Sequence, residues 1–147
     1  MIKNISNLGD AAVYCDFGKE VNKEINTNVI KYFYSIRNQK IKGINNLTPS
    51  YNKLIISFDL KLTNFNEIKK KIENLNINEV FIQNNKELKI PVCCDKIFGL
   101  DIGILEKKLY LKKDKILENF FNKEYFCYMT GFIAGMPFLG DLNKNMH

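Results

Sequence analysis

The chain of 147 residues is 46% hydrophobic and 26% charged, the balance of a folded protein with one ordinary domain, or one small domain and part of another. Its formal net charge of +6 raises the question of a nucleic-acid partner, but Arg37 is the only arginine and the lysines are scattered, so we expect a solvated surface and no nucleic acid. No apolar run approaches the about 20 residues of a membrane span, and no signal peptide is visible, so we expect a cytoplasmic protein without a membrane partner.

The first half of the chain has the pattern of an α+β domain. Ala11–Phe17 is apolar and lies between the turn signals Gly9-Asp10 and Gly18, which predicts a strand. A helix follows, because apolar residues recur every three or four positions and share one face. These residues are Val21, Ile25, Val29, Phe33 and Ile36. The next predicted elements are two strands, a helix and a closing strand, at Ile44–Leu47, Leu54–Phe58, Asn66–Leu75 and Val80–Ile82. The order β-α-β-β-α-β predicts a ferredoxin-like N-terminal domain over residues 1–85.

The pattern changes in residues 86–147, where we predict strand, helix, helix and strand. Leu88–Cys94 alternates in polarity, which predicts a half-buried strand, with Pro91 at an edge or bulge. Two helices follow, and Asp114 is expected to cap the second. Their inward-facing residues are Ile102, Leu105 and Leu109 in the first helix and Ile116, Leu117, Phe120 and Phe121 in the second. Tyr125–Phe132 is predicted to be a strand that is apolar on both faces; it either pairs with Leu88–Cys94 or needs cover from elsewhere.

Few side chains suit catalysis or metal binding. The four cysteines lie in apolar surroundings and are predicted to be reduced and buried. They are Cys15, Cys93, Cys94 and Cys127. Because there is no C-x-x-C pair and only one histidine, we expect no metal site. That histidine, His147, could be a general acid or base in a complete protein, although a terminal histidine is more often disordered. Asp10 could orient a substrate amine or a partner, or bond its own backbone.

The most informative segment is Gly131–Gly140, a run rich in glycine and aromatic residues. Its candidate site residues are Gly131, Phe132, Gly135, Pro137, Phe138 and Gly140. Glycines permit close backbone approach, and the aromatic rings supply broad apolar faces. Such a loop can present amide donors to an anion or a planar substrate, or it can be a turn braced against the core by its aromatic residues.

This run resembles the Gly-Phe-x-Pro-Gly-Phe-Pro-Tyr-Leu-Gly signature of the 5-oxoprolinase B-subunit family, which also includes the histidine-kinase inhibitor KipI and proteins similar to the first subunit of allophanate hydrolase. The resemblance extends along the chain. Further agreement lies at Leu8–Ala12, Leu47–Tyr51, Ile90–Cys94 and Phe98–Asp101. Ala134, Met136 and Phe138 depart from the signature, and Phe138 lacks the hydroxyl of the tyrosine that the signature has there.

The resemblance implies that the intact protein is the B subunit of an ATP-dependent 5-oxoprolinase, which opens 5-oxoproline to glutamate together with its A and C subunits. ATP, the cofactor of the complex, would activate the lactam, and the glycine loop would face the site or a partner protein. The alternative that it implies is a KipI-like regulator that binds a sensor histidine kinase. Family members continue into a cyclophilin-like β domain, so we expect residues 86–147 to lead into an incomplete copy of that domain and the truncated chain to be inactive alone.

Overall fold

The computed structural model describes residues 1–77 and 86–147. The chain forms two compact units. One holds the N-terminal part of the chain together with Tyr128–Pro137, and the other holds the later helices together with Phe138–His147. The predicted strand Val80–Ile82 and the predicted domain boundary at residue 85 lie outside the described residues, so both stay predictions.

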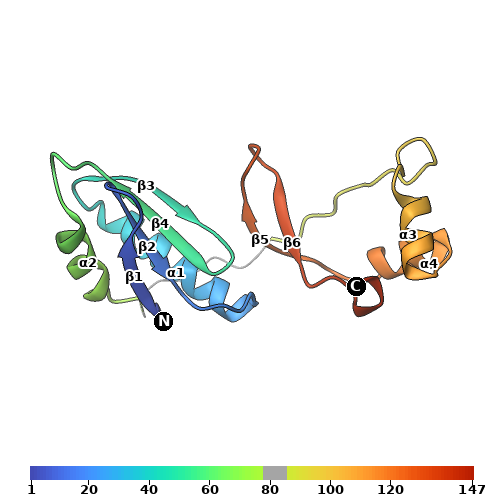
Figure 1. Ribbon diagram of the computed structural model, residues 1–147, viewed down its shortest axis with the longest axis horizontal. Coiled ribbons are helices and arrows are strands. Elements are labelled where there is room, and N and C mark those ends of the chain that lie inside the picture. The colour runs from blue at the N-terminus through green and yellow to red at the C-terminus, as the bar shows by residue number, and fades with distance from the viewer. Residues whose placement is uncertain (78–85) are drawn as a thin grey trace. The chain divides into compact units, whose positions relative to one another are not determined.

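The N-terminal unit contains a four-stranded antiparallel sheet in the order β1-β2-β4-β3 (Figure 1). Its elements are β1 (Asn4–Asn7), β2 (Ala12–Asp16), α1 (Lys23–Gln39), β3 (Ile44–Pro49), β4 (Lys53–Phe58) and α2 (Phe65–Glu73). Five of these six were predicted, and the mixed α and β class is confirmed. The ferredoxin-like assignment stays a prediction, because its closing strand falls among the residues that are not described.

Strand β1 was not predicted. Its sequence is mostly polar and only partly buried, so it lacks the alternation that identifies a half-buried strand. It pairs with β2 from Asn4 opposite Asp16 to Asn7 opposite Val13 and forms an edge of the sheet. The turn between the two strands is closed by the Leu8 N–H, which donates to the Ala12 carbonyl at 2.9 Å.

Both helices share one core with the sheet. Alternate residues of β2 and β4 are buried, so one face of the sheet is covered. The core consists of Val13, Cys15, Phe17, Val29, Tyr32, Ile36, Leu54, Ile56, Phe58, Ile68 and Ile72. The apolar stripe predicted for α1 is therefore buried at its centre, at Val29 and Ile36. Val21 is an exception, because it precedes α1 and is 50% exposed.

The two helices begin at asparagine caps, which explains their start points. The Asn22 side chain accepts the Ile25 N–H at 2.9 Å at the start of α1. At the start of α2, Asn64 accepts the Glu67 N–H at 3.1 Å, and its amide donates back to the Glu67 carboxylate at 2.9 Å. Such bonds satisfy amides that the first turn leaves without partners, so the loop before each helix is well defined.

The second unit contains the two predicted helices, α3 (Ile102–Leu109) and α4 (Lys113–Phe121). The capping role predicted for Asp114 is wrong, because Lys112 is the cap residue and makes no side-chain cap bond. Instead the Glu106 carboxylate of α3 accepts the Lys113 N–H at 2.8 Å. A neighbouring helix thus satisfies the amide that a local cap normally satisfies.

The predicted strand Leu88–Cys94 is wrong. The segment has no regular secondary structure, and Leu88 and Ile90 are 77% and 65% exposed. Its alternation is genuine, but a strand also needs a partner, and Tyr125–Phe132 does not provide one. That segment contains β5 (Phe126–Thr130), which pairs with β6 (Pro137–Gly140); a short 3-10 helix, η1 (Lys144–Met146), follows.

The prediction of buried cysteines holds only for Cys15. Its thiol is fully buried in the core, and burial raises its pKa to about 12, because a thiolate loses its hydration there. Cys93 and Cys127 are exposed and Cys94 is half-buried. The error at Cys93 follows from the missing strand, since the segment that was expected to bury it lies at the surface.

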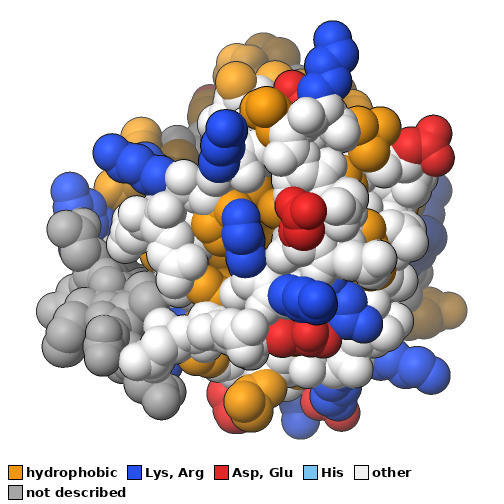
Figure 2. All heavy atoms as spheres, turned by 90° about the vertical axis from the view of Figure 1, so that its left-hand side faces the viewer, with side chains coloured by type: hydrophobic (Ala, Val, Ile, Leu, Met, Phe, Trp, Pro, Cys, Tyr) orange, Lys and Arg blue, Asp and Glu red, His pale blue; other side chains and the backbone are white. Residues whose placement is uncertain are grey.

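Charged side chains of both signs are interspersed on the surface. Figure 2 shows lysine and arginine side chains spread over one face, with acidic side chains between them. Within the described parts of the chain, no helix is long and apolar enough to cross a membrane.

Candidate functional site

The glycine-rich segment Gly131–Gly140, which resembles the family signature, forms the tip and the second strand of the β5–β6 hairpin. Gly131–Met136 connects the two strands, and the loop is held by its own backbone bonds. The Gly131 N–H donates to the Met136 carbonyl at 3.1 Å, and the Met136 N–H donates to the Ile133 carbonyl at 3.0 Å. The Ile133 N–H donates back to the Gly131 carbonyl at 2.7 Å. These three amides are used within the loop, which leaves fewer donors for an oxyanion.

Phe132 has a conformation that bulky residues rarely adopt. Its φ is +63°, in the left-handed region, whereas the flanking Gly131 is not in that region. Its ring is 90% exposed, and Ile133 and Met136 are 62% and 43% exposed. Strained backbone and exposed apolar side chains at one tip are costly for a free protein, and such features gather at binding sites. The tip is therefore better suited to contact with a partner than to acid–base chemistry.

The other predicted site residues of the run lie in the same hairpin. Gly135 has a φ of +81°, which favours glycine at the turn, although an added Cβ would meet no atom within 4 Å. Pro137 begins β6, a strand position at which proline is tolerated, while Phe138 is half-buried and Gly140 ends the strand. The loop is thus a shaped turn.

Asp10 and His147 are not part of the hairpin. Asp10 is exposed in the turn between β1 and β2, and His147 is exposed after η1, where its N–H donates to the Lys144 carbonyl at 3.4 Å. Each is separate from the Gly131–Gly140 loop along the chain, and no hydrogen bond to a nucleophile is seen for either within residues 1–77 and 86–147. Among the described residues, no group of histidine, cysteine and acidic side chains could hold a metal ion.

Buried Asn26 anchors the base of the hairpin in the N-terminal unit. The side-chain amide of this α1 residue lies 3.1 Å from the Ser50 carbonyl, 3.0 Å from the Tyr51 carbonyl and 3.1 Å from the Tyr128 carbonyl. The rings of Tyr51 and Tyr128 also pack, with centroids 5.4 Å apart. Two stretches of the family resemblance, around Tyr51 and after Tyr128, are thereby brought together.

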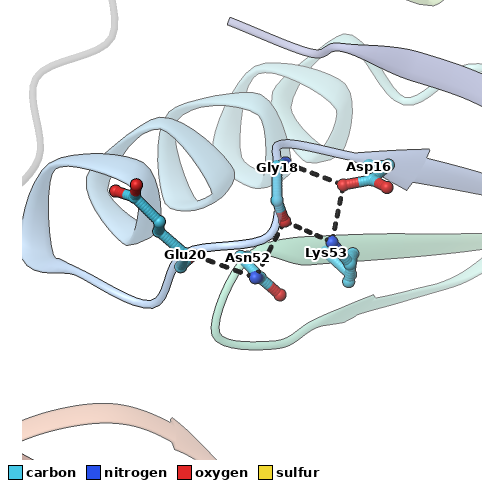
Figure 3. Close-up of polar contacts among 5 residues, drawn as sticks. All are labelled: Asp16, Gly18, Glu20, Asn52 and Lys53. Carbon is cyan, nitrogen blue, oxygen red and sulfur yellow. Dashed lines mark hydrogen bonds and ion pairs between the residues drawn. The ribbon is translucent and has the colours of Figure 1, made fainter.

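A second set of polar contacts fixes the turn that Asn26 binds (Figure 3). Lys53 Nζ donates to Asp16 Oδ1 and to the Gly18 carbonyl, both at 2.5 Å. Asn52 donates to the Gly18 and Glu20 carbonyls, both at 2.9 Å. The Gly18 N–H donates to Asp16 Oδ1 at 2.7 Å. These bonds tie the loop from β2 to α1 to the β3–β4 turn. The turn residues that Asn26 contacts are therefore held in one conformation.

The charges of this cluster favour ionised Asp16. The hydrogen bond from Lys53, followed by that from the Gly18 N–H, holds the pKa of the Asp16 carboxyl below its ordinary value, because both bonds stabilise the carboxylate. With its proton lost and a lysine beside it, Asp16 is suited to holding the turn in place. It is poorly suited to acting as a general acid near neutral pH.

Sequence reasoning missed Asn26, Asn52 and Lys53. A signal for Asn26 existed, since it lies three positions before Val29 on the buried stripe of α1, where an amide has to find partners inside the protein. For Lys53 there was none, because a lysine at a strand start normally faces solvent.

The comparisons with known proteins bear on this arrangement. The family model described as carboxyltransferase domain, subdomain C and D, matches residues 3–147. The chain belongs to this family. It is similar to the B subunit of 5-oxoprolinase from Bacillus subtilis (strain 168), at 29% identity over 97% of this chain. The predicted resemblance to the 5-oxoprolinase B-subunit family is confirmed.

The match to that relative is partial in length. The chain spans 64% of the Bacillus subtilis protein. A crystal structure of a protein named TTHA0988 is similar to this chain, with a TM-score of 0.78 and 20% identity over 93% of this chain and 27% of that one. At this identity the similarity supports the fold of this carboxyltransferase C and D family member and nothing about its chemistry.

Proposed function

We propose that this chain belongs to the B subunit of an ATP-dependent 5-oxoprolinase and acts in the cytoplasm with the A and C subunits of that enzyme. The observation that carries the proposal is the similarity to a 5-oxoprolinase B-type protein along 97% of the chain. 5-Oxoproline and ATP are then ligands of the complex. No nucleophile–base pair lies among the residues that the structure describes, so we expect no turnover from this chain alone.

The hairpin tip, Gly131–Met136, is the proposed contact with the C subunit, called the C-type partner protein below. Phe132 and Ile133 are large, apolar and mostly exposed, and truncating aromatic residues at interfaces often has large effects on binding. The tip is held by backbone bonds at its neck and by the Asn26 contacts at its base. A pre-shaped tip loses little conformational freedom on binding, which favours affinity.

The proposal extends to the domains of the chain. We assign residues 1–85 to a ferredoxin-like domain and residues 86–147 to the beginning of a cyclophilin-like domain.

The partner contact can be tested by co-expression with the C-type partner protein of the same organism. The tagged chain should retain that partner on an affinity column, and Phe132→Ser should weaken binding at least about tenfold, because the ring is the centre of the tip. Tyr110→Ser is a matched control, since Tyr110 is also aromatic, 92% exposed and in a left-handed conformation, with φ +53°. It should leave binding unchanged.

Two outcomes would contradict the contact. Equal binding by Phe132→Ser and the unchanged chain would show that the tip is not part of the interface. Failure to retain the C subunit would show that it is not the partner. Retention of a sensor histidine kinase in its place would favour the regulatory alternative.

A further inference from the structure

A groove between the end of α1 and strand β3 has the composition of a binding site. It measures about 310 Å³, the lower end of the range for small-molecule pockets. Its floor is apolar and includes Ile36, which is 1% exposed, and the partly buried Phe33 and Leu47. All of its lining residues belong to the N-terminal unit and to the described part of the chain. The groove is separate from the hairpin tip.

The rim of this groove is positively charged. Arg37 and Lys40 line it together with the amides of Asn45 and Asn46, and none of the lining residues is acidic. Within the described residues, neither cation is in an ion pair. The Arg37 guanidinium carbon lies 6.0 Å from the centroid of the Phe33 ring, so the side chain rests over the apolar floor.

A structural role in helix termination accounts for only part of this charge. The end of a helix carries about half a negative charge, which a single cation in the last turn offsets. Here Arg37 lies in the last turn and Lys40, the left-handed cap with φ +46°, adds a second cation. The excess positive charge faces a pocket with donor amides, and of these the Asn46 amide uses one hydrogen on the Thr48 hydroxyl, at 3.1 Å.

We propose that this groove binds a small organic carboxylate with an apolar body. The planar guanidinium of Arg37 matches a carboxylate in a bidentate geometry, and Lys40 adds a point charge beside it. The apolar body of the ligand lies against Ile36 and Leu47. The proposal does not depend on the proposed enzyme function, because it concerns different residues.

The test is an NMR titration of the full ¹⁵N-labelled chain with hexanoate. Because Arg37 is the only arginine, its side-chain Nε–H signal assigns itself. Saturable shifts of this signal and of the Asn45 side-chain amide are expected, with a Kd of about 1–10 mM for a ligand of this size. Arg37→Gln should raise that Kd about tenfold, since it removes a charge-assisted pair.

Control ligands and a control variant separate this site from general charge effects. Hexanamide has the same apolar body without the charge, and inorganic phosphate has charge without the body; both should bind at least about fivefold more weakly than hexanoate. Lys42→Gln removes an exposed charge that does not line the groove, and its Kd should be unchanged. Arg37 is exposed, so its variant should retain the backbone spectrum of the folded chain.

Three results would overturn the proposal. They are shifts that do not saturate, an equal Kd for phosphate and hexanoate, and an equal loss of affinity in Lys42→Gln and Arg37→Gln. Each would reduce the groove to a generally basic surface.

Discussion

The Asn26 side chain is the best single position at which to test how the two motif stretches are held together. Asn26→Ala removes an amide whose two hydrogens are shared among the carbonyls of Ser50, Tyr51 and Tyr128. A buried hydrogen bond contributes about 1 kcal/mol, and a buried carbonyl left without a donor costs about 1–3 kcal/mol. Only the bond to Tyr128 is fully buried, so water can reach the other carbonyls. We therefore expect the free energy of unfolding to fall by about 2–4 kcal/mol.

The assay is urea unfolding followed by far-UV circular dichroism, with hydrogen exchange of the β4 amides as a local probe. Asn38→Ala is the matched control, because Asn38 lies on the same helix and is exposed; it should change the unfolding free energy by no more than about 0.5 kcal/mol. Equal effects of Asn26→Ala and Asn38→Ala would refute the reasoning.

Asn26→Asp gives a second test, with a distinctive dependence on pH. The new carboxylate would face three carbonyl oxygens, so folding should raise its pKa above the ordinary value near 4. The variant should bind more protons when folded than when unfolded, and its stability should fall as pH rises from about 4 through the folded pKa. A stability that is independent of pH, relative to the unchanged chain, would contradict this placement of the side chain.

Three further predictions address other parts of the structure. The folded pKa of Asp16 lies below its unfolded value, so the unchanged chain should lose stability as the pH falls below about 4 and this carboxylate is protonated. Asp16→Asn should remove this contribution to the pH dependence. Acid unfolding curves of equal shape for the two chains would contradict the pairing of Asp16 with Lys53. Phe132→Gly should leave the unfolding free energy within about 1 kcal/mol or raise it, because the left-handed strain is relieved and no buried contact is lost; calorimetry measures this. Cys93 should react with iodoacetamide at pH 8 in the native chain, whereas Cys15, with its pKa of about 12, should react only after unfolding; mass spectrometry locates the label.

The periodicity of apolar residues predicted the helices and strands that bury one face in the core. The stripe of Val29 and Ile36 on α1 and the alternation of Leu54 and Ile56 on β4 reflect burial directly, so the sequence could reveal them. The edge strand Asn4–Asn7 could not be found this way, because one strand partner and little burial leave no apolar pattern.

The opposite error, at Leu88–Cys94, has a related cause. An alternating pattern records the faces a strand would have, but only pairing forms it, and pairing depends on residues distant in the sequence. The same holds for the candidate site. Its glycine-rich run indicated a loop or turn, but not its pairing in a hairpin, and the bond from Asn26 to the Tyr128 carbonyl joins residues 102 positions apart. The left-handed conformation of Phe132 also could not be predicted, since Gly131 directly before it and Gly135 shortly after it adopt such conformations more easily.

The measurement that tests the proposed function most directly is 5-oxoproline-dependent ATP hydrolysis. The protein that contains this chain would be co-expressed with the A and C subunits of its own organism, and each preparation would be assayed with and without 5-oxoproline. We predict hydrolysis that requires 5-oxoproline and disappears when this protein is left out. A rate that is unchanged by leaving it out, or no hydrolysis with all three proteins present, would contradict the assignment to the B subunit.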